Sequence, residues 1–600
     1  MYRLPEGKRL PRGLSAALLS LVLCLCVRAQ APAQGATSSP PPPAQDSTKQ
    51  APAPATAAET AIHDTPTTFK VRVNLVVVRV VVRDSEGKPV ANLRKEDFLL
   101  SDNRKPQTIS TFSMETAASR TVKNVNVPIA AAADAPEPAP VSGLAQRFIT
   151  MLFDDVHLSL TDSSFVRKSA ERFLNKLGPS DRVAMFSTSG QVNLDFTNDR
   201  DALEKTLLGL SPRPRALAPD LHACPDVSYY QADLIENKRD QTALAAATED
   251  ALVCAFQGDR TQIQAAQAMA EGQAMATLAA GDADANFAYR NMEVAVRRLM
   301  SMPGERVMVL VSPGFIPTTL WSDISGLIDR ATRAKVVINT IDARGLYTPD
   351  FGDIASPSQD SFRSAGYKAS YRVAAQSAQD EVLVALADGT GGTFFHNRND
   401  IDVGMELAGA APEVSYVLGF SPQNMKVDGS YHTLKVTLAN KLKYALQARR
   451  GYYAPKGLKD PAEVAKEEIQ EAIFSQEEIR DMPVELQTQF FKKDASEARL
   501  AVLTRFDVKG IHFRKNEGRN QDNVTIATAI FDENGNFVTG GEKVVEMKLL
   551  DTTYDRLTHS GFTVKSSFDV KPGTYMVRMV VRDGEGQQMA ARNGAVVIPD

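Results

Sequence analysis

Shortages of cysteine, histidine and net charge narrow what this protein can do. Its 600 residues include 4 cysteines and 7 scattered histidines, and the formal net charge is -4 at pH 7. So small a charge gives no reason to expect a nucleic acid or an anionic membrane as partner. The motifs G-x-S-x-G, H-E-x-x-H and G-x-x-x-x-G-K-S/T are also absent, and with them the usual signatures of serine hydrolases, zinc proteases and P-loop proteins. We therefore predict that the protein is not an enzyme.

Long apolar runs are lacking too, except near the N-terminus. Basic residues between Arg3 and Arg12 precede an apolar core at 14–27, and Val27 and Ala29 place small residues before a cleavage point. This pattern predicts a cleavable signal peptide, residues 1–29, because the core is too short to span a bilayer. An uncleaved anchor is the alternative. With no transmembrane segment expected in the mature chain, the protein is predicted to be secreted or to lie in the periplasm or cell envelope.

Removing the signal peptide leaves two cysteines, Cys224 and Cys254. In an oxidising compartment, two such cysteines are expected to form a disulfide. Two separate free thiols are the alternative. A bridge would also leave no thiol nucleophile in the mature chain, in keeping with a protein that is not an enzyme.

Changes in composition divide the chain into modules. Stretches rich in proline and alanine cannot bury a core and are typical of disordered linkers. Alternating apolar residues between turn signals are typical of strands. The modules expected on these grounds are a Pro/Ala-rich linker at 30–66, a small N-terminal β-unit at 67–116, a linker at 117–143, a β segment at 413–455, a helical connector at 456–480 and an immunoglobulin-like β-sandwich at 481–600.

Between these modules, residues 144–412 alternate strand and helix patterns. Short apolar runs such as Phe148–Phe153 and Val336–Ile341 are typical of strands buried on both faces, and helical periodicity follows the first of them. The alternation predicts an α/β fold: a doubly wound, mostly parallel sheet of Rossmann-like type, flanked by all-β modules. An insertion at 211–286 carries both mature cysteines and a long Ala/Gln/Met-rich helical stretch.

Two acids, Asp154 and Asp155, end the first apolar run, and the later β segment closes with RRGYYAP at 449–455. With its alternating strands and helices, this region resembles the von Willebrand factor type A (VWA) domain. Most of the mature chain is similar to secreted bacterial VWA-related proteins. The resemblance implies a VWA-like fold and an exported protein, but it names no partner.

VWA domains typically bind a divalent cation through D-x-S-x-S after the first strand, together with a distant Thr and an Asp after a later strand. Read from Asp154, both serine positions hold apolar residues, and read from Asp155 they hold His157 and Ser159. The later strand ends at Ser312 without an acid. Because a hard cation needs several oxygen donors, no complete site and no cofactor are expected. A weak magnesium or calcium site at Asp154, Asp155 and Ser159 stays open, as does the alternative that Asp155 or Ser159 caps the next helix.

Ligands of open α/β sheets bind beyond the carboxyl ends of the strands. Asp342 and Arg344 follow another central strand, where Arg344 is expected to neutralise the acids. A polar loop at 348–377, with Tyr367 and Tyr371, is expected to lie over the same edge and supply binding contacts. The leading hypothesis is an exported, non-catalytic binding or adhesion protein that uses its VWA-like domain for protein–protein interaction. The alternatives are a cell-envelope enzyme or sensor that uses the acidic cluster, and a structural envelope component.

Overall fold

The computed structural model describes residues 59–63, 76–84, 88–116, 125, 144–213, 224–346, 365–409, 414–422, 430–439, 444–454, 461–476 and 478–599. The signal peptide and nearly all of the two linkers expected at 30–66 and 117–143 lie outside these residues. Wherever the chain is described, no helix combines the length and the apolarity needed to cross a bilayer. The architecture is mixed α/β, with several antiparallel sheets and a β-rich C-terminal region.

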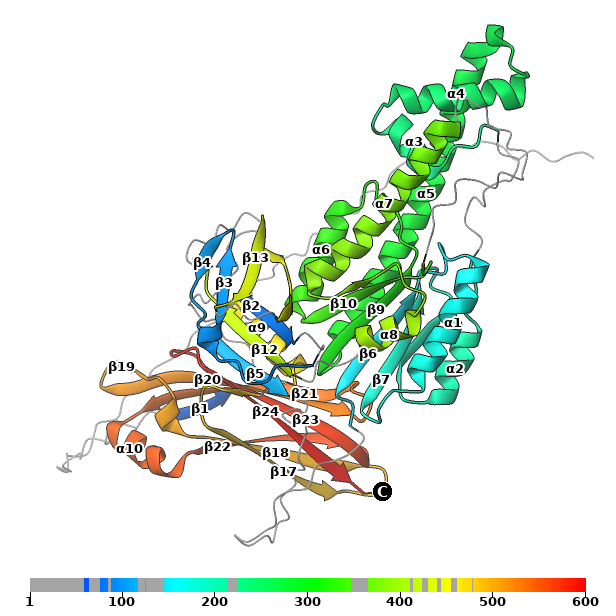
Figure 1. Ribbon diagram of the computed structural model, residues 1–600. Helices are drawn as coiled ribbons and strands as arrows, with labels where there is room; N and C mark the ends of the chain where they lie inside the picture. The colour runs from blue at the N-terminus through cyan, green and yellow to red at the C-terminus, as the bar shows by residue number, and fades with distance from the viewer. Residues whose placement is uncertain are drawn as a thin grey trace, which may run out of the picture. The chain divides into compact units, whose positions relative to one another are not determined.

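The central sheet has six strands in the order β11-β10-β9-β6-β7-β8 (Figure 1). Neighbouring strands are parallel, except that β8 runs antiparallel to β7. Nearly every side chain of β6, β7 and β9 is buried, as expected for strands covered on both faces. The strands are β6 (Arg147–Phe153), β7 (Asp181–Ser187), β8 (Asn193–Thr197), β9 (Glu305–Ser312), β10 (Val336–Asp342) and β11 (Phe394–Phe395).

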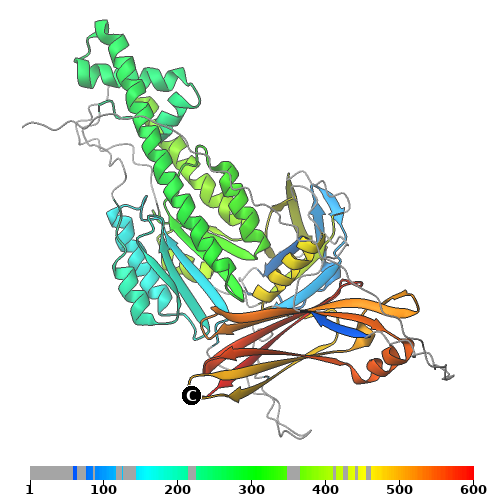
Figure 2. The same cartoon turned by 180° about the vertical axis from the view of Figure 1, so that it is seen from behind.

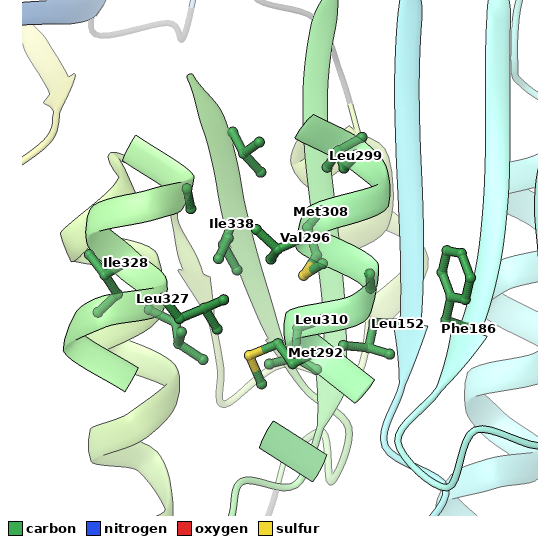
Figure 3. Close-up of a cluster of buried hydrophobic side chains, with 14 of the residues drawn as sticks. Leu152, Phe186, Met292, Val296, Leu299, Met308, Leu310, Leu327, Ile328 and Ile338 are labelled. Atoms are coloured by element: carbon green, nitrogen blue, oxygen red, sulfur yellow. The ribbon is translucent and has the colours of Figure 1, made fainter. Parts of the chain in front are cut away.

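Helices cover the two faces of this sheet and form a hydrophobic core on each. On one face α5, α6 and α7 pack against the strands, and Figure 3 shows Met292, Val296 and Leu327 from these helices beside Met308 and Ile338 of the sheet. On the other face α1, α2 and α8 pack around Ile149, Val183 and Val309. The helices are α1 (Leu160–Leu174), α2 (Arg200–Leu208), α5 (Ile263–Met300), α6 (Trp321–Arg333), α7 (Ala365–Thr390) and α8 (Ile401–Gly409).

Two of these helices are longer than the sequence pattern predicts. The prediction of a loop at 348–377 is wrong for its second half, because α7 begins at Ala365. Residues 348–364 lie outside the described part of the chain. Similarly, α5 joins the insertion to the sheet as one helix of 38 residues, and Figure 2 shows it in green along its whole length. Both segments lack proline and are rich in alanine, so nothing interrupts the helix. Their polar residues obscured the apolar periodicity.

The insertion is a helical unit built on α3 (Tyr229–Glu236), α4 (Gln241–Phe256) and the first half of α5. Its core consists mainly of alanines, which allow close approach of the helices. The predicted disulfide is confirmed: Cys224 and Cys254 are bonded with their Cα atoms 5.9 Å apart. The bridge ties the segment before α3 to α4.

The β-unit at 67–116 and the β segment at 413–455, expected as two modules, form one. β2 pairs with β12 and β14, and β3 pairs with β13, so that both segments share one core around Val80, Phe98 and Tyr416. The α/β domain is therefore inserted into this β-module. Its strands are β2 (Val76–Arg83), β3 (Phe98–Asp102), β4 (Lys105–Gln107), β5 (Thr111–Thr116), β12 (Val414–Phe420), β13 (Tyr431–Leu438), β14 (Ala445–Ala448) and β15 (Gly451–Tyr453).

The C-terminal region has two antiparallel sheets that share hydrophobic cores. The smaller sheet has the order β17-β18-β22, and the larger has β1-β21-β20-β23-β24-β16 with β19 beside β20. Its first strand, β1 (Thr60–His63), comes from the stretch expected to be a linker. The other elements are α9 (Pro461–Phe474), β16 (Ile479–Arg480), β17 (Val484–Lys492), β18 (Ala498–Phe506), β19 (Arg514–Asn516), β20 (Arg519–Asp532), β21 (Phe537–Leu549), α10 (Asp551–Ser560), β22 (Phe562–Val570), β23 (Gly573–Asp583) and β24 (Met589–Ile598).

Candidate binding edge of the α/β sheet

The carboxyl ends of β6, β9 and β10 lie side by side at one edge of the central sheet. Residues that end or follow these strands are in register, since Phe153 pairs with Val311 and Ser312 with Asp342. The backbone of the next residue continues the ladder: the Asp154 amide donates to the carbonyl of Val311 at 3.0 Å. The topology thus brings Asp154, Ser312 and Asp342 to one edge.

Asp154 is fully buried, and three neighbouring side chains bind its carboxylate. The His157 Nδ1 lies 2.8 Å from Oδ1, the Thr188 hydroxyl donates to Oδ1 at 2.7 Å, and the Ser312 hydroxyl donates to Oδ2 at 2.5 Å. Burial by itself raises the pKa of Asp154. The nearby His157 and the three hydrogen bonds together outweigh burial, so the net pKa lies below its ordinary value.

Asp155 is also buried, and its carboxylate faces the end of β7. Its Oδ1 accepts the Ser189 amide at 2.8 Å, and its Oδ2 accepts the Ser189 hydroxyl at 2.6 Å. The Thr188 hydroxyl lies 3.2 Å from Oδ1, and Arg213 Nε lies 3.7 Å from Oδ2. The two acids therefore hold the loop after β6 to the loop after β7 and to Ser312.

Ser159 does not join the two acids. It caps α1, because its hydroxyl accepts the Asp162 amide at 3.1 Å and donates to the Asp162 carboxylate at 2.7 Å. Helix capping by Ser159, one of the two alternatives, is thus confirmed. Throughout the described part of the chain, no three His, Cys, Asp or Glu side chains are grouped as a metal site would need. The donor set Asp154, Asp155 and Ser159 does not fit a hard cation, since hydrogen bonds to protein already engage its oxygens.

Arg344 is held in ion pairs. Its Nε lies 2.8 Å from Asp342 Oδ1 and its Nη2 lies 2.9 Å from Asp342 Oδ2, while Nη2 also contacts Asp380 of α7. Burial lowers the pKa of Arg344, but Asp342 and Asp380 outweigh it and raise the pKa above its ordinary value. The expected ion pair is present, and it fastens α7 to the sheet edge.

Tyr367 and Tyr371, expected on a loop over the edge, lie on the first turns of α7. Tyr371 packs against the alanine-rich core of the insertion, whereas Tyr367 is exposed. Nearby, the buried Lys368 pairs with Asp250 of α4 at 2.6 Å. Through Tyr371 and Lys368, the start of α7 packs against the insertion.

Sequence reasoning missed the contact that joins the insertion to the sheet edge. The Tyr229 hydroxyl donates to Asp282 at 2.7 Å and lies 3.0 Å from the Thr318 hydroxyl, in the loop that follows β9. Gly281 leaves room for the ring, because a Cβ there would come within 2.2 Å of Tyr229. The signal for this site is weak in the sequence, since a glycine inside a helical pattern has several explanations. Thr188 and Ser189, which directly follow β7, were also missed.

Three large apolar side chains remain exposed along the same edge. Leu160 begins the helix after β6, Trp321 begins the helix after β9, and Leu346 follows β10. Their exposed fractions are 77%, 37% and 64%. Each lies a few residues beyond the end of a parallel strand, where loops commonly carry binding residues. None of the three was singled out by the sequence.

Comparison with known proteins assigns the chain to no family. No protein-family model matches it, and no curated protein matches it either. A glycosyl hydrolase family 2 member from Bacteroides cellulosilyticus DSM 14838 aligns at 12% identity with a TM-score of 0.15, over 31% of this chain and 20% of that chain. The pilus adhesin SpaC from Lactobacillus rhamnosus GG, in an open conformation, aligns at 8% identity with a TM-score of 0.22, over 83% of this chain and 56% of that chain. Scores this low carry no argument about function.

Proposed function

We propose that this is an exported, non-catalytic binding or adhesion protein, secreted or held in the periplasm or cell envelope. In this proposal the α/β domain is a doubly wound, VWA-like domain that binds another protein at the carboxyl edge of its sheet. The parallel pairing of β6, β7, β9, β10 and β11, with helices on both faces, supports that assignment. The paired sheets of the C-terminal region support an immunoglobulin-like sandwich as its neighbour.

The observation that carries this proposal is that Asp154 and Asp342, two acids at the sheet edge, are both bound by neighbouring side chains. A general acid or base needs a pKa near the working pH and access to its substrate. Asp154 is fully buried, and its pKa is shifted downward, away from neutrality. Asp342 is paired with Arg344. Such groups brace loops well, but they are poorly placed to exchange protons with a bound molecule. The enzyme or sensor alternative is correspondingly weaker.

In this proposal the contact surface consists of the exposed side chains at this edge of the sheet, Leu160, Trp321 and Leu346. Trp321 is the only tryptophan of the chain, and tryptophan is enriched among the residues that dominate binding energy at interfaces. Leu160 and Leu346 flank it in sheet order, since β9 lies between β6 and β10. Exposed apolar side chains beyond the carboxyl ends of neighbouring strands are accessible to a partner that docks on this edge.

Site-specific photocross-linking tests the proposal. A photoreactive phenylalanine analogue replaces Leu346 in the full chain, and in a matched control it replaces Leu208, which is 76% exposed at the end of α2. After irradiation in envelope extract, we expect a cross-linked protein from position 346 and none from position 208. Adding Leu160→Glu should reduce the yield by about tenfold, because a charge buried against an apolar partner surface should cost about 1.4 kcal/mol of binding free energy.

Two results would count against the proposal. Identical cross-linked products from both positions would mean non-specific adsorption. A product from position 346 that is unaffected by Leu160→Glu, and also by Trp321→Ala, would place the contact outside this edge.

A further inference from the structure

The outer edge of β21 has a short strand of the same chain bound to it. On its inner side β21 pairs with β20 along its whole length: Leu549 is opposite Asn520 at one end, and Phe537 is opposite Phe531 at the other. On its outer side β21 pairs with β1, which runs antiparallel to it. Thr60 is opposite Met547, and His63 is opposite Val544. No other strand in the described ranges pairs with this edge.

The residue before β1 anchors it at the start of α10. The carbonyl of Glu59 accepts the Lys548 amide at 2.9 Å, and its carboxylate accepts the Leu550 amide at 3.3 Å. Hydrogen bonding by Thr553 lowers the pKa of Glu59, with further contributions from the Leu550 amide and two nearby arginines. The edge therefore offers two features to an incoming segment: a backbone ladder for a strand and a helix N-terminus for a carboxylate in front of it.

β1 is short and partly exposed. It has four residues, and the side chain of Ile62 remains 50% exposed. Further along β21, Phe537 and Val538 are exposed beside backbone that β1 does not reach. An open edge of this kind is a template for another strand. Residues 64–75 separate β1 from β2, and a stretch of that length can extend to about 40 Å.

We propose that the outer edge of β21 is a strand-acceptor site and that residues 59–63 of a second copy occupy it by strand exchange. A second copy carries the same carboxylate and the same strand, so the exchanged pairing reproduces every contact seen within one chain. When two copies exchange their strands reciprocally, each β21 again carries a β1 strand, and the assembly closes with twofold symmetry. A peptide from another protein could form the backbone hydrogen bonds to β21, but it would lack a carboxylate placed as Glu59 is to accept the Leu550 amide.

Thiol cross-linking between two single-cysteine chains tests this directly. Ala61 and Glu546 are register partners, so a full chain with Ala61→Cys is mixed with a full chain with Glu546→Cys and treated with a short bis-maleimide. Both chains carry serine in place of the two N-terminal cysteines, and the remaining pair is disulfide-bonded. In the matched control, Glu542→Cys replaces Glu546→Cys on the same strand.

We expect a covalent heterodimer from the Ala61 and Glu546 positions. The control should give about tenfold less, because four residues of strand move the thiol about 13 Å away. Adding Ile62→Pro to the first chain, or an excess of the peptide AAETAIHDT (residues 57–65), should suppress the product. The proposal is overturned if a chain with both cysteines cross-links internally while the mixture gives no more product than the control. Cross-linking of position 546 to a foreign protein, with none to a second copy, would also overturn it.

Discussion

Removing the Asp154 carboxylate should strongly destabilise the α/β domain. In Asp154→Ala, the side chains of His157, Thr188 and Ser312 lose the carboxylate that all three contact. Each hydrogen bond to a charged group contributes about 1.5–3 kcal/mol. The total should be lower than their sum, since the donors can partly pair again, and we expect a loss of about 3–5 kcal/mol, as for other broken buried pairs. Ser312→Ala removes one donor and should cost about 1.5–3 kcal/mol.

The single tryptophan makes this measurable within a chain of several domains. Trp321 lies at the start of α6, so its fluorescence reports unfolding of the α/β domain and little else. With a urea dependence of about 2 kcal/mol per molar, the unfolding midpoint of Asp154→Ala should fall by about 2 M. Asp201→Ala, an exposed acid in the first turn of α2, is the matched control and should change stability by less than about 0.5 kcal/mol.

The pH dependence has a defined sign. Because the folded pKa of Asp154 is lowered, its contribution is complete above the ordinary aspartate pKa of about 4 and is lost as the pH falls through the folded value. The difference between wild type and Asp154→Ala should therefore shrink in acid. An unchanged or raised midpoint for Asp154→Ala at neutral pH would refute the bracing role. It would favour the enzyme or sensor alternative, because functional acids are often held at the expense of stability.

Three further outcomes are expected. Gly281→Ala should lower stability by about 1–3 kcal/mol, because the added methyl group meets the Tyr229 ring. Gly272→Ala in the same helix has open space around it and should raise stability by about 0.5–1 kcal/mol. Equal effects at both positions would contradict the packing argument. Burial and the charge of Asp583 raise the pKa of Asp522 to about 7, so stability decreases as the pH rises above about 4. Asp522→Asn should remove this decrease and stabilise the C-terminal region by up to about 4 kcal/mol near pH 8, as circular dichroism melts at pH 5 and pH 8 would show. Reducing the disulfide of the insertion should cost that unit about 3–4 kcal/mol in the chain-entropy model. It should also increase amide hydrogen exchange in α3 and α4, and unchanged exchange would argue against its stabilising role.

The sequence alone predicted most elements whose pattern is strong and local. Strands β6 and β10 lie within a residue or two of the predicted positions, and α9 lies inside the helical connector expected at 456–480, because continuous apolar runs and regular helical spacing depend only on nearby residues. The gathering of Asp154, Ser312 and Asp342 at one edge follows from parallel strands alone. The disulfide could also be predicted, since only one pairing of the two mature cysteines exists.

Tertiary structure decided what pairs with what. The strand pattern in the N-terminal β-unit shows that β2 can be a strand, but not that it pairs with β12, because side-chain alternation places no constraint on a partner hundreds of residues away. Strand β1, in the stretch expected to be a linker, forms by pairing with β21. The role of the acids was likewise beyond the sequence. Whether Asp154 serves a metal, a substrate or its own neighbours depends on the positions of Thr188 and Ser312, and only packing brings those hydroxyl groups within reach of a buried carboxylate.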